Sequence, residues 1–241
     1  MTGQEAVELI RQEAWTGRKP GLSRTRELLK RVGDPHQKLK YVHITGTNGK
    51  GSTAAMVASV LAQAGLTVGL YTSPHLWSFH ERFQVNGVPI SDDALGRIAE
   101  RVIQAGRGME DPATEFELMT AVGMLYFLEA GCDLVVLEVG LGGRMDSTNV
   151  IPAPEVAVIT NIGLEHTREL GDTLAQIATE KSGILKPGCD AVLYHQSGEV
   201  EKVVSDACRR QGIPLTLTDP EGLRVLGSGR EGQTFTYRDW G

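Results

Sequence analysis

Short apolar runs alternate with amphipathic stretches along most of the chain. The apolar runs have the length of buried strands and cover Tyr41–Thr45, Thr67–Tyr71, Leu134–Val139, Val156–Thr160, Ala191–Tyr194 and Leu215–Leu217. Helices are predicted for Gln4–Ala14, Ser23 to about Val32, Ser52–Ala64, Ser91 to about Gln104, Thr114–Ala130, Asp172 to about Ser182 and Gly198–Arg210. Strands that alternate with helices predict an α/β fold, in which a mostly parallel sheet carries helices on both faces.

The residues after Pro220 follow a different pattern. Leu223–Leu226 and Thr234–Tyr237 alternate between apolar and polar positions, as antiparallel strands do. The sequence then ends at Asp239–Trp240–Gly241 without a helix that would cover these strands. We therefore expect a short antiparallel β segment here, and we interpret residues 1–241 as one domain from a longer protein.

Local turn and cap signals add detail to this outline. The Asn86–Gly87 pair predicts a hairpin across Arg82–Ile90. Ser23 is expected to cap the second helix. Thr114 and Glu117 have the spacing of a capping box, which predicts that a helix begins directly after Thr114.

Charge and cysteine content exclude several classes of protein. The chain has 24 Lys and Arg against 30 Asp and Glu, a net charge of −6, which argues against binding nucleic acid or a membrane surface through bulk charge. The uncharged stretch Thr53–Pro74 is interrupted at Gly65, so we interpret it as a helix and a strand rather than a membrane span. We expect a cytoplasmic protein with reduced thiols, because no C-x-x-C pair occurs among Cys132, Cys189 and Cys208. We also expect a monomer.

A glycine-rich loop separates the first predicted strand from an uncharged helix. Its residues are Gly46, Thr47, Asn48, Gly49, Lys50, Gly51 and Ser52. Glycines let successive backbone N–H groups face one anion, and the helix N-terminus adds partial positive charge. Lys50 would then contact the outer phosphates of ATP, and the Ser52 hydroxyl would ligate Mg²⁺. The strict P-loop pattern is not met, since it requires Gly at Ile44 and Ser or Thr at Gly51. The alternative is an ordinary glycine-rich turn.

Three further polar residues follow predicted strands. Ser73, Glu138 and His166 each lie at or just past the end of a strand, and a parallel sheet brings such ends to one edge. One carboxylate, hydroxyls and an imidazole suit Mg²⁺ better than zinc. The alternatives are a turn serine at Ser73, a salt bridge from Glu138 to Arg144, and a loop histidine at His166 that is hydrogen-bonded locally.

The phosphate loop is one of six sequence blocks that share a resemblance. The other blocks are Thr72–Leu76, Thr114–Glu117, Glu138–Asn149, Thr160–Thr167 and Glu180–Gly188. In this order, across roughly residues 20 to 190, they resemble the folylpolyglutamate synthase/dihydrofolate synthase family of the Mur ligase superfamily. The resemblance implies the family's P-loop NTPase-like, ATP-binding central domain without its C-terminal glutamate ligase domain. It also implies a hairpin cut before its second strand, with a first strand from about Gln233 to Gly241.

The resemblance also implies roles for individual residues. Lys181 matches a lysine that the family carbamylates, which would let it support a second Mg²⁺ or orient His166; the alternative is a surface lysine near a helix end. The implied catalytic residues are Lys50, His166 and Lys181, and the implied metal ligands are Ser52, Ser73, Glu138, His166 and Lys181. The implied folate contacts are Gly21, Leu22, Ser23, Thr114, Glu115, Phe116, Glu117, Met145, Asp146 and Ser147. The capping box explains Thr114–Glu117 equally well.

The functional hypothesis is a ligase that uses ATP and Mg²⁺. A folate or dihydropteroate carboxylate would attack the γ-phosphate, and the amine of L-glutamate would then displace phosphate from the acyl phosphate. Dihydrofolate synthesis, polyglutamate extension and both together stay open. One alternative is another Mur-type amide ligase acting on a UDP-linked cell-wall precursor. The other is a nucleotide-binding fragment without catalysis of its own, and we expect the isolated chain to be a poor ligase.

Overall fold

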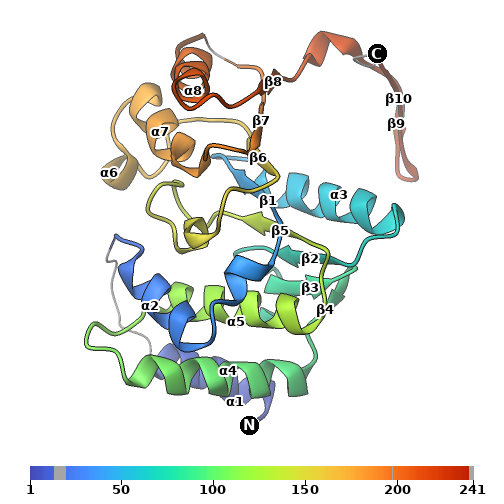
Figure 1. Ribbon diagram of the computed structural model, residues 1–241. Helices are drawn as coiled ribbons and strands as arrows, with labels where there is room; N and C mark the ends of the chain where they lie inside the picture. Colours follow the sequence, from blue (N-terminus) through green and yellow to red (C-terminus); the bar gives the residue numbers. More distant parts are fainter. Residues whose placement is uncertain (14–19, 197, 239–241) are drawn as a thin grey trace.

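The computed structural model describes residues 1–13, 20–196 and 198–238 (Figure 1). Its α-helices are α1 (Gly3–Glu13), α2 (Ser23–Arg31), α3 (Lys50–Gln63), α4 (Asp92–Arg107), α5 (Glu115–Glu129), α6 (Thr167–Leu170), α7 (Leu174–Lys181) and α8 (Gly198–Gln211). Its strands are β1 (Tyr41–Thr45), β2 (Val68–Tyr71), β3 (Phe83–Val85), β4 (Val88–Pro89), β5 (Leu134–Glu138), β6 (Val156–Ile159), β7 (Asp190–Leu193), β8 (Leu215–Leu217), β9 (Leu223–Gly229) and β10 (Gly232–Tyr237). Short 3₁₀ helices are η1 (Pro35–Lys38), η2 (Phe79–Arg82), η3 (Ser147–Val150), η4 (Ser182–Ile184) and η5 (Pro220–Gly222).

The main sheet is mostly parallel, as the sequence pattern predicts. Its strand order is β4-β3-β2-β5-β1-β6-β7-β8. In the part of this order that runs β2-β5-β1-β6-β7-β8, each strand pairs in parallel with its neighbour. The other two strands, β3 and β4, form an antiparallel edge beside β2. The predicted Asn86–Gly87 turn joins β3 to β4, and both residues have the positive φ that such a two-residue hairpin requires. The carboxyl ends of β2, β5 and β1 are therefore neighbours at one edge.

Helices cover both faces of the sheet. On one face α3 packs through Ala54 and Ala58 against Val42 and Ile44 of β1. Alternate strand residues point to the opposite face, where Tyr41 belongs to the core formed with α1, α2, α4 and α5. Farther along the sheet α7 and α8 pack on β6 and β7, and Figure 1 shows them across the sheet from α3. The prediction of a doubly covered α/β sheet is confirmed.

The helix α5 is buried nearly all round. Its residues from Leu118 to Leu125 are buried without interruption, because the helix lies between the sheet and the outer pair α1 and α4. The predicted capping box starts it: Thr114 Oγ1 accepts the Glu117 N–H at 3.3 Å, and Glu117 Oε2 accepts the Thr114 N–H at 2.8 Å. Burial and capping together fix the position of the first turn of α5.

One predicted cap is wrong, and one helix begins later than predicted. Ser23 is the first residue of α2 rather than its cap, and Leu22 at the cap position makes no side-chain hydrogen bond. Thr173 rather than Asp172 caps α7, because its hydroxyl accepts the Gln176 N–H while the Gln176 side chain accepts the Thr173 N–H. Two further helix bounds shift by more than one residue, since α3 begins at Lys50 rather than Ser52 and α4 extends to Arg107 rather than about Gln104.

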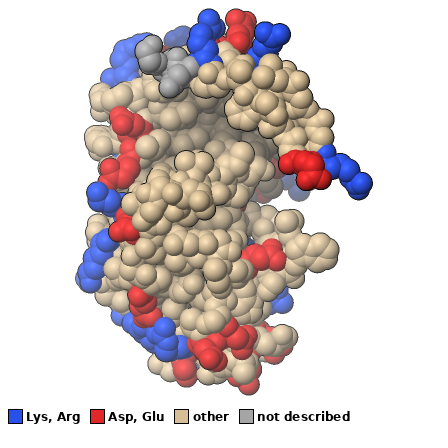
Figure 2. Space-filling model, turned by 90° about the vertical axis from the view of Figure 1, so that its right-hand side faces the viewer, with Lys and Arg blue, Asp and Glu red and all other residues tan. Residues whose placement is uncertain are grey.

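The predicted antiparallel segment is a two-stranded hairpin, β9 and β10, apart from the main sheet. The expected strand from Gln233 is therefore the second strand of a hairpin rather than the first. Its apolar residues are exposed, including Leu226 and Phe235, as are Met56 and Val60 of α3. Figure 2 shows a broad uncharged surface on this side of the molecule.

Three sequence predictions lie partly or wholly outside the described residues. They are the helix end at Ala14, the end of the Gln233 strand beyond Arg238, and the chain end at Asp239–Gly241. Within the described part of the chain, no helix combines the length and apolar character that crossing a membrane requires. The uncharged Thr53–Pro74 stretch contains most of α3, a turn with Gly65 at φ 94°, and β2.

Candidate functional site

The phosphate loop leads from β1, near the centre of the sheet, into α3. Gly49 caps α3 with φ 83°, a left-handed conformation that glycine adopts without strain. Gly46 allows a close approach instead, since a Cβ there would lie 1.8 Å from Thr160 Oγ1. Thr160 donates its hydroxyl to Asn48 O at 2.8 Å, and the Thr47 N–H donates to Asn161 O at 2.6 Å. The segment after β6 therefore holds the loop in one conformation.

The N-terminus of α3 is suited to an anion. The first turn carries no acidic residue, and Lys50 is its first helical residue. The Lys50 ammonium donates to Thr47 O at 3.1 Å, so the cation lies back over the loop. Ser52 is exposed in the same turn. A phosphate site typically combines the positive end of a helix dipole, backbone N–H groups that can donate, and a cation.

Glu138 lies beside this loop at the end of β5. Its side chain is 4% exposed, and Oε2 accepts the Ser73 N–H at 3.0 Å. Burial raises the pKa of Glu138, and the Ser73 N–H and the nearby Lys50 charge oppose that shift. A Cβ on Gly51 would lie 3.5 Å from Glu138 Oε2, which shows how closely the loop approaches this carboxylate. The alternative salt bridge is wrong, because Arg144 pairs with Glu180, with Nε 3.5 Å from Oε1.

Lys181, at the end of α7, is buried rather than on the surface. Its side chain is 2% exposed, and Nζ donates to Gly46 O at 2.6 Å. Burial, with a smaller contribution from the Lys50 charge, lowers the pKa of Lys181 to about 8, against a small upward effect of Glu165. The surface-lysine interpretation is therefore wrong, and the amine lies directly beneath the phosphate loop.

His166 lies apart from this lysine. It precedes α6 in a left-handed conformation with φ 49°, and its side chain is about half exposed at 49%. Nε2 lies 3.7 Å from Glu165 Oε1. Among the described residues no hydrogen bond or ion pair joins His166 to Lys181.

The residues at the loop fit Mg²⁺ only in part. In the described ranges no three His, Cys, Asp or Glu side chains converge as a ready-made metal site. Mg²⁺ in nucleotide sites usually takes one or two protein oxygens, and phosphate oxygens and water supply the rest. Glu138 and the Ser52 hydroxyl, both beside the loop, suit that pattern. Ser73 is tied to Glu138 through its backbone N–H, while His166 and Lys181 contribute no contact to this pair.

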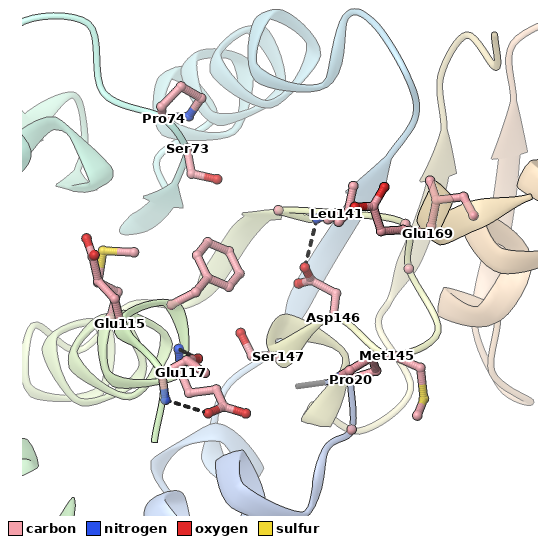
Figure 3. A pocket seen from close by; sticks show the side chains of 18 of the residues that line it. Pro20, Ser73, Pro74, Glu115, Glu117, Leu141, Met145, Asp146, Ser147 and Glu169 are labelled. Carbon is pink, nitrogen blue, oxygen red and sulfur yellow. Dashed lines mark hydrogen bonds between the residues drawn. The ribbon is translucent and has the colours of Figure 1, made fainter. Parts of the chain in front are cut away.

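A cavity of about 980 Å³ opens next to the carboxyl end of β5. Its walls include most of the predicted folate contacts, namely Gly21, Thr114, Glu115, Phe116, Glu117, Met145, Asp146 and Ser147. Leu22 and Ser23 are not among the lining residues. Figure 3 shows the first turn of α5, with Glu115 and Glu117, across the cavity from the segment with Met145 and Asp146. Ser73 also lines the cavity, and its N–H donates to Glu138, which the phosphate loop approaches at Gly51.

Asp146 has a dense set of local hydrogen-bond donors. Its carboxylate accepts the Thr148 N–H at 3.0 Å, the Thr148 hydroxyl at 2.5 Å and the Leu141 N–H at 2.9 Å. His43 Nε2, fully buried on β1, lies 2.9 Å from the same Thr148 hydroxyl. Burial raises the pKa of Asp146, and the Thr148 and Leu141 hydrogen bonds oppose it. The carboxylate is therefore held rigidly at the cavity wall.

Some cavity residues were not predicted. They are Arg11, Pro20, Pro74, Arg82, Met119, Gly140, Leu141, Gly142, Gly143, Arg168, Glu169, Leu170 and Glu180. No local pattern marks the arginines, which come from separate segments that only the fold brings together. The glycine run after β5 did stand out in the sequence. Its role is close packing: a Cβ on Gly140 would lie 2.4 Å from the Phe116 ring, and one on Gly143 2.8 Å from Lys181 O.

Comparisons with known proteins agree with this geometry. The Mur ligase middle domain matches residues 44–194. The dihydrofolate synthase/folylpolyglutamate synthase of Bacillus subtilis (strain 168) is 42% identical over 217 residues, which make up 88% of this chain and 50% of that protein. A solved structure described as an FPGS–AMPPCP–folate complex has a TM-score of 0.92 at 38% identity, covering 100% of this chain and 60% of that chain. A solved structure described as E. coli FolC in complex with DHPP and ADP has a TM-score of 0.82 at 30% identity. That match covers 97% of this chain and 57% of that chain.

The chain spans about half the length of the curated relatives it matches. The matched middle domain nevertheless accounts for more than half of the 241 residues. The chain therefore belongs to the Mur ligase family, and the curated relatives it matches include folylpolyglutamate and dihydrofolate synthases.

Proposed function

We propose that this chain is the ATP- and folate-binding part of a ligase that adds L-glutamate to a folate or dihydropteroate carboxylate. The observation that carries the proposal is the junction between the phosphate loop and the cavity. Ser73 lines the cavity while its N–H donates to Glu138, which faces the loop. A carboxylate at the inner end of the cavity would therefore lie next to the terminal phosphate of a nucleotide on the loop.

The reaction that fits this arrangement has two steps. A carboxylate oxygen of the pteridine substrate attacks the γ-phosphorus, the bond to the β-bridging oxygen breaks, and ADP leaves. The glutamate amine then attacks the acyl phosphate, an amide forms, and phosphate and a proton are released. Lys50 and the N–H groups of the loop stabilise negative charge on the transferring phosphoryl group, and the cavity orients the carboxylate for in-line attack.

Mg²⁺, when bound, would neutralise phosphate charge, and we assign Ser52 and Glu138 to hold it. The pteridine contacts are assigned to the lining residues Gly21, Thr114–Phe116 and Met145–Ser147. The glutamate contacts are assigned to the half of the relatives that this chain does not span. Relatives named for one or for both synthase activities match the chain, so the proposal covers dihydrofolate synthesis and polyglutamate extension alike.

Lys181 is proposed to be carbamylated in the working enzyme. Its neutral amine would add to CO₂, forming an N–C bond and releasing one proton, and the product is an anion. A pKa lowered to about 8 leaves a useful fraction of neutral amine at physiological pH. The test is ¹³C NMR with labelled bicarbonate, in which a carbamate signal should appear in the parent and be absent from Lys181→Met.

Equilibrium binding tests the substrate class. We expect the 241-residue chain to bind Mg-AMPPCP and 7,8-dihydropteroate, and to add glutamate poorly because it spans only about half the length of the relatives it matches. A UDP-linked cell-wall precursor is the control ligand, and it should not compete for the cavity. Competition by the precursor with no binding of any pteridine would overturn the proposed substrate. We also propose that the chain is cytoplasmic and monomeric. Sedimentation of the purified chain would check the monomeric state.

A further inference from the structure

A buried ion pair joins two walls of the cavity. Arg24 lies in the first turn of α2, and Leu22 and Ser23 separate it from Pro20 and Gly21, which line the cavity. Glu117 lies in the first turn of α5, and it lines the cavity from the other side. Both side chains are 5% exposed. Two charges removed from water so completely require a structural or functional reason.

The pair has the geometry of a two-point clamp. Arg24 Nε donates to Glu117 Oε2 at 3.0 Å, and Arg24 Nη2 lies 2.9 Å from Glu117 Oε1. The third nitrogen, Nη1, donates to Asp111 Oδ2 at 3.3 Å. A planar guanidinium that meets both oxygens of a carboxylate fixes direction as well as distance, which a lysine ammonium does not do.

The clamp leaves little of Glu117 for a ligand. Oε2 accepts from both Arg24 and the Thr114 N–H, and Oε1 is taken by Arg24. Figure 3 shows this carboxylate at the edge of the cavity, turned toward the start of its own helix. Burial disfavours the charge on Arg24, yet hydrogen bonds and attraction from Glu117 and Asp111 outweigh it and raise the pKa of Arg24. The guanidinium of Arg24 therefore stays charged where it contacts Glu117.

We propose that Arg24 and Glu117 are positioning residues for the pteridine ligand: their ion pair holds the turn at Pro20–Gly21 at a set distance from Thr114–Phe116, so that the cavity keeps the width of a flat heterocycle. The inference rests on the proposed function for the identity of the ligand. It reassigns Glu117 from a folate contact to the support behind the contacts. The phosphate loop lies on other elements, so nucleotide binding should be independent of the clamp.

The test compares three variants of the full chain. Arg24→Lys keeps the charge and loses the planar fork, and Glu117→Gln keeps the shape and loses the charge. Arg26→Met is the matched control, because Arg26 is an exposed arginine on the same helix. Dihydropteroate affinity should fall at least about tenfold in Arg24→Lys and in Glu117→Gln, while Mg-AMPPCP affinity stays within about twofold. The control should leave both affinities within about twofold.

Dihydropteroate affinity within about twofold of the parent in both clamp variants would overturn the proposal. Equal losses of pteridine and nucleotide affinity would overturn it as well, because they would show a general loss of structure. If Arg24→Lys fails to fold, Glu117→Gln carries the same comparison, since the amide still accepts the Thr114 N–H. A circular dichroism spectrum of each variant checks folding.

Hydrogen exchange without ligand separates this inference from the proposed function. Amides of residues 21–24 and 114–118 should exchange at least about tenfold faster in Arg24→Lys than in Arg26→Met. Unchanged exchange at these amides would overturn the clamp even if a pteridine binds. Faster exchange in a chain that binds no pteridine would support the clamp as a link between α2 and α5 and would refute the proposed ligand instead.

Discussion

Lys181 should make the folded chain more stable as the pH rises from 8 to 10.5, and Lys181→Met should remove that gain. Burial lowers the pKa of this amine from 10.5 to about 8 in the folded protein. Between these two values the unfolded chain carries one proton more than the folded chain at this residue. The free energy of unfolding therefore increases with pH across this window.

The size of the effect follows from the two pKa values. Each pH unit between about 8 and 10.5 adds about 1.4 kcal/mol, so the whole window adds about 3 kcal/mol. Below pH 8 both states are protonated and the full cost of about 3 kcal/mol is present. Lys181→Met removes this titration, but it also leaves Gly46 O without its donor, at a cost of about 1–3 kcal/mol at every pH.

Urea unfolding of both proteins at pH 7, 8, 9 and 10 measures the difference, in buffer free of CO₂ and metal ions. Other titrating groups, including Lys186 with its pKa also lowered to about 8, are present in both proteins and cancel. Above pH 8, the free energy of unfolding of the parent should increase relative to that of Lys181→Met with each rise in pH. A difference that stays constant within about 0.5 kcal/mol from pH 7 to 10 would refute the reasoning, because Lys181 would then titrate alike in both states.

Other substitutions test the phosphate loop. Lys50→Ala should weaken Mg-ATP binding at least about tenfold, roughly 1.4 kcal/mol, measured by calorimetry; equal affinity at matched folding would place the phosphates elsewhere. Glu138→Gln should reduce the Mg²⁺ dependence of nucleotide binding and change stability by less than about 1 kcal/mol, since Gln still accepts the Ser73 N–H; intact Mg²⁺ dependence would remove Glu138 from the metal site. Gly46→Ala should lower stability by more than about 2 kcal/mol and abolish nucleotide binding, because its Cβ would overlap Thr160, 1.8 Å from Oγ1; an unchanged melting temperature would contradict this contact.

The local pattern of the sequence is enough for the elements and for the loop. Apolar runs predict β1 and β8 with their observed bounds, and β1 is buried along its whole length, as a strand covered on both faces is. The Thr114–Glu117 box and the Asn86–Gly87 turn act over a few residues, and both are present as predicted. The predicted cap at Ser23 was wrong, since Leu22 holds the cap position of α2, and the helix predicted from Asp172 begins after the Thr173 cap.

Residue type and spacing carry no information on which distant side chains meet. Lys181 reaches Gly46 across 135 positions, and Arg24 reaches Glu117 across 93. From the sequence, a surface position was an alternative for Lys181, and a salt bridge to Arg144 was an alternative for Glu138. The strand order settled the position of Glu138, because it places β5 between β2 and β1 and so brings Ser73, Glu138 and the phosphate loop to one edge. The packing of α7 settled the position of Lys181, whose amine donates to Gly46 O of that loop. Burial, pairing and pKa depend on that packing, and packing is a property of the whole chain rather than of any segment.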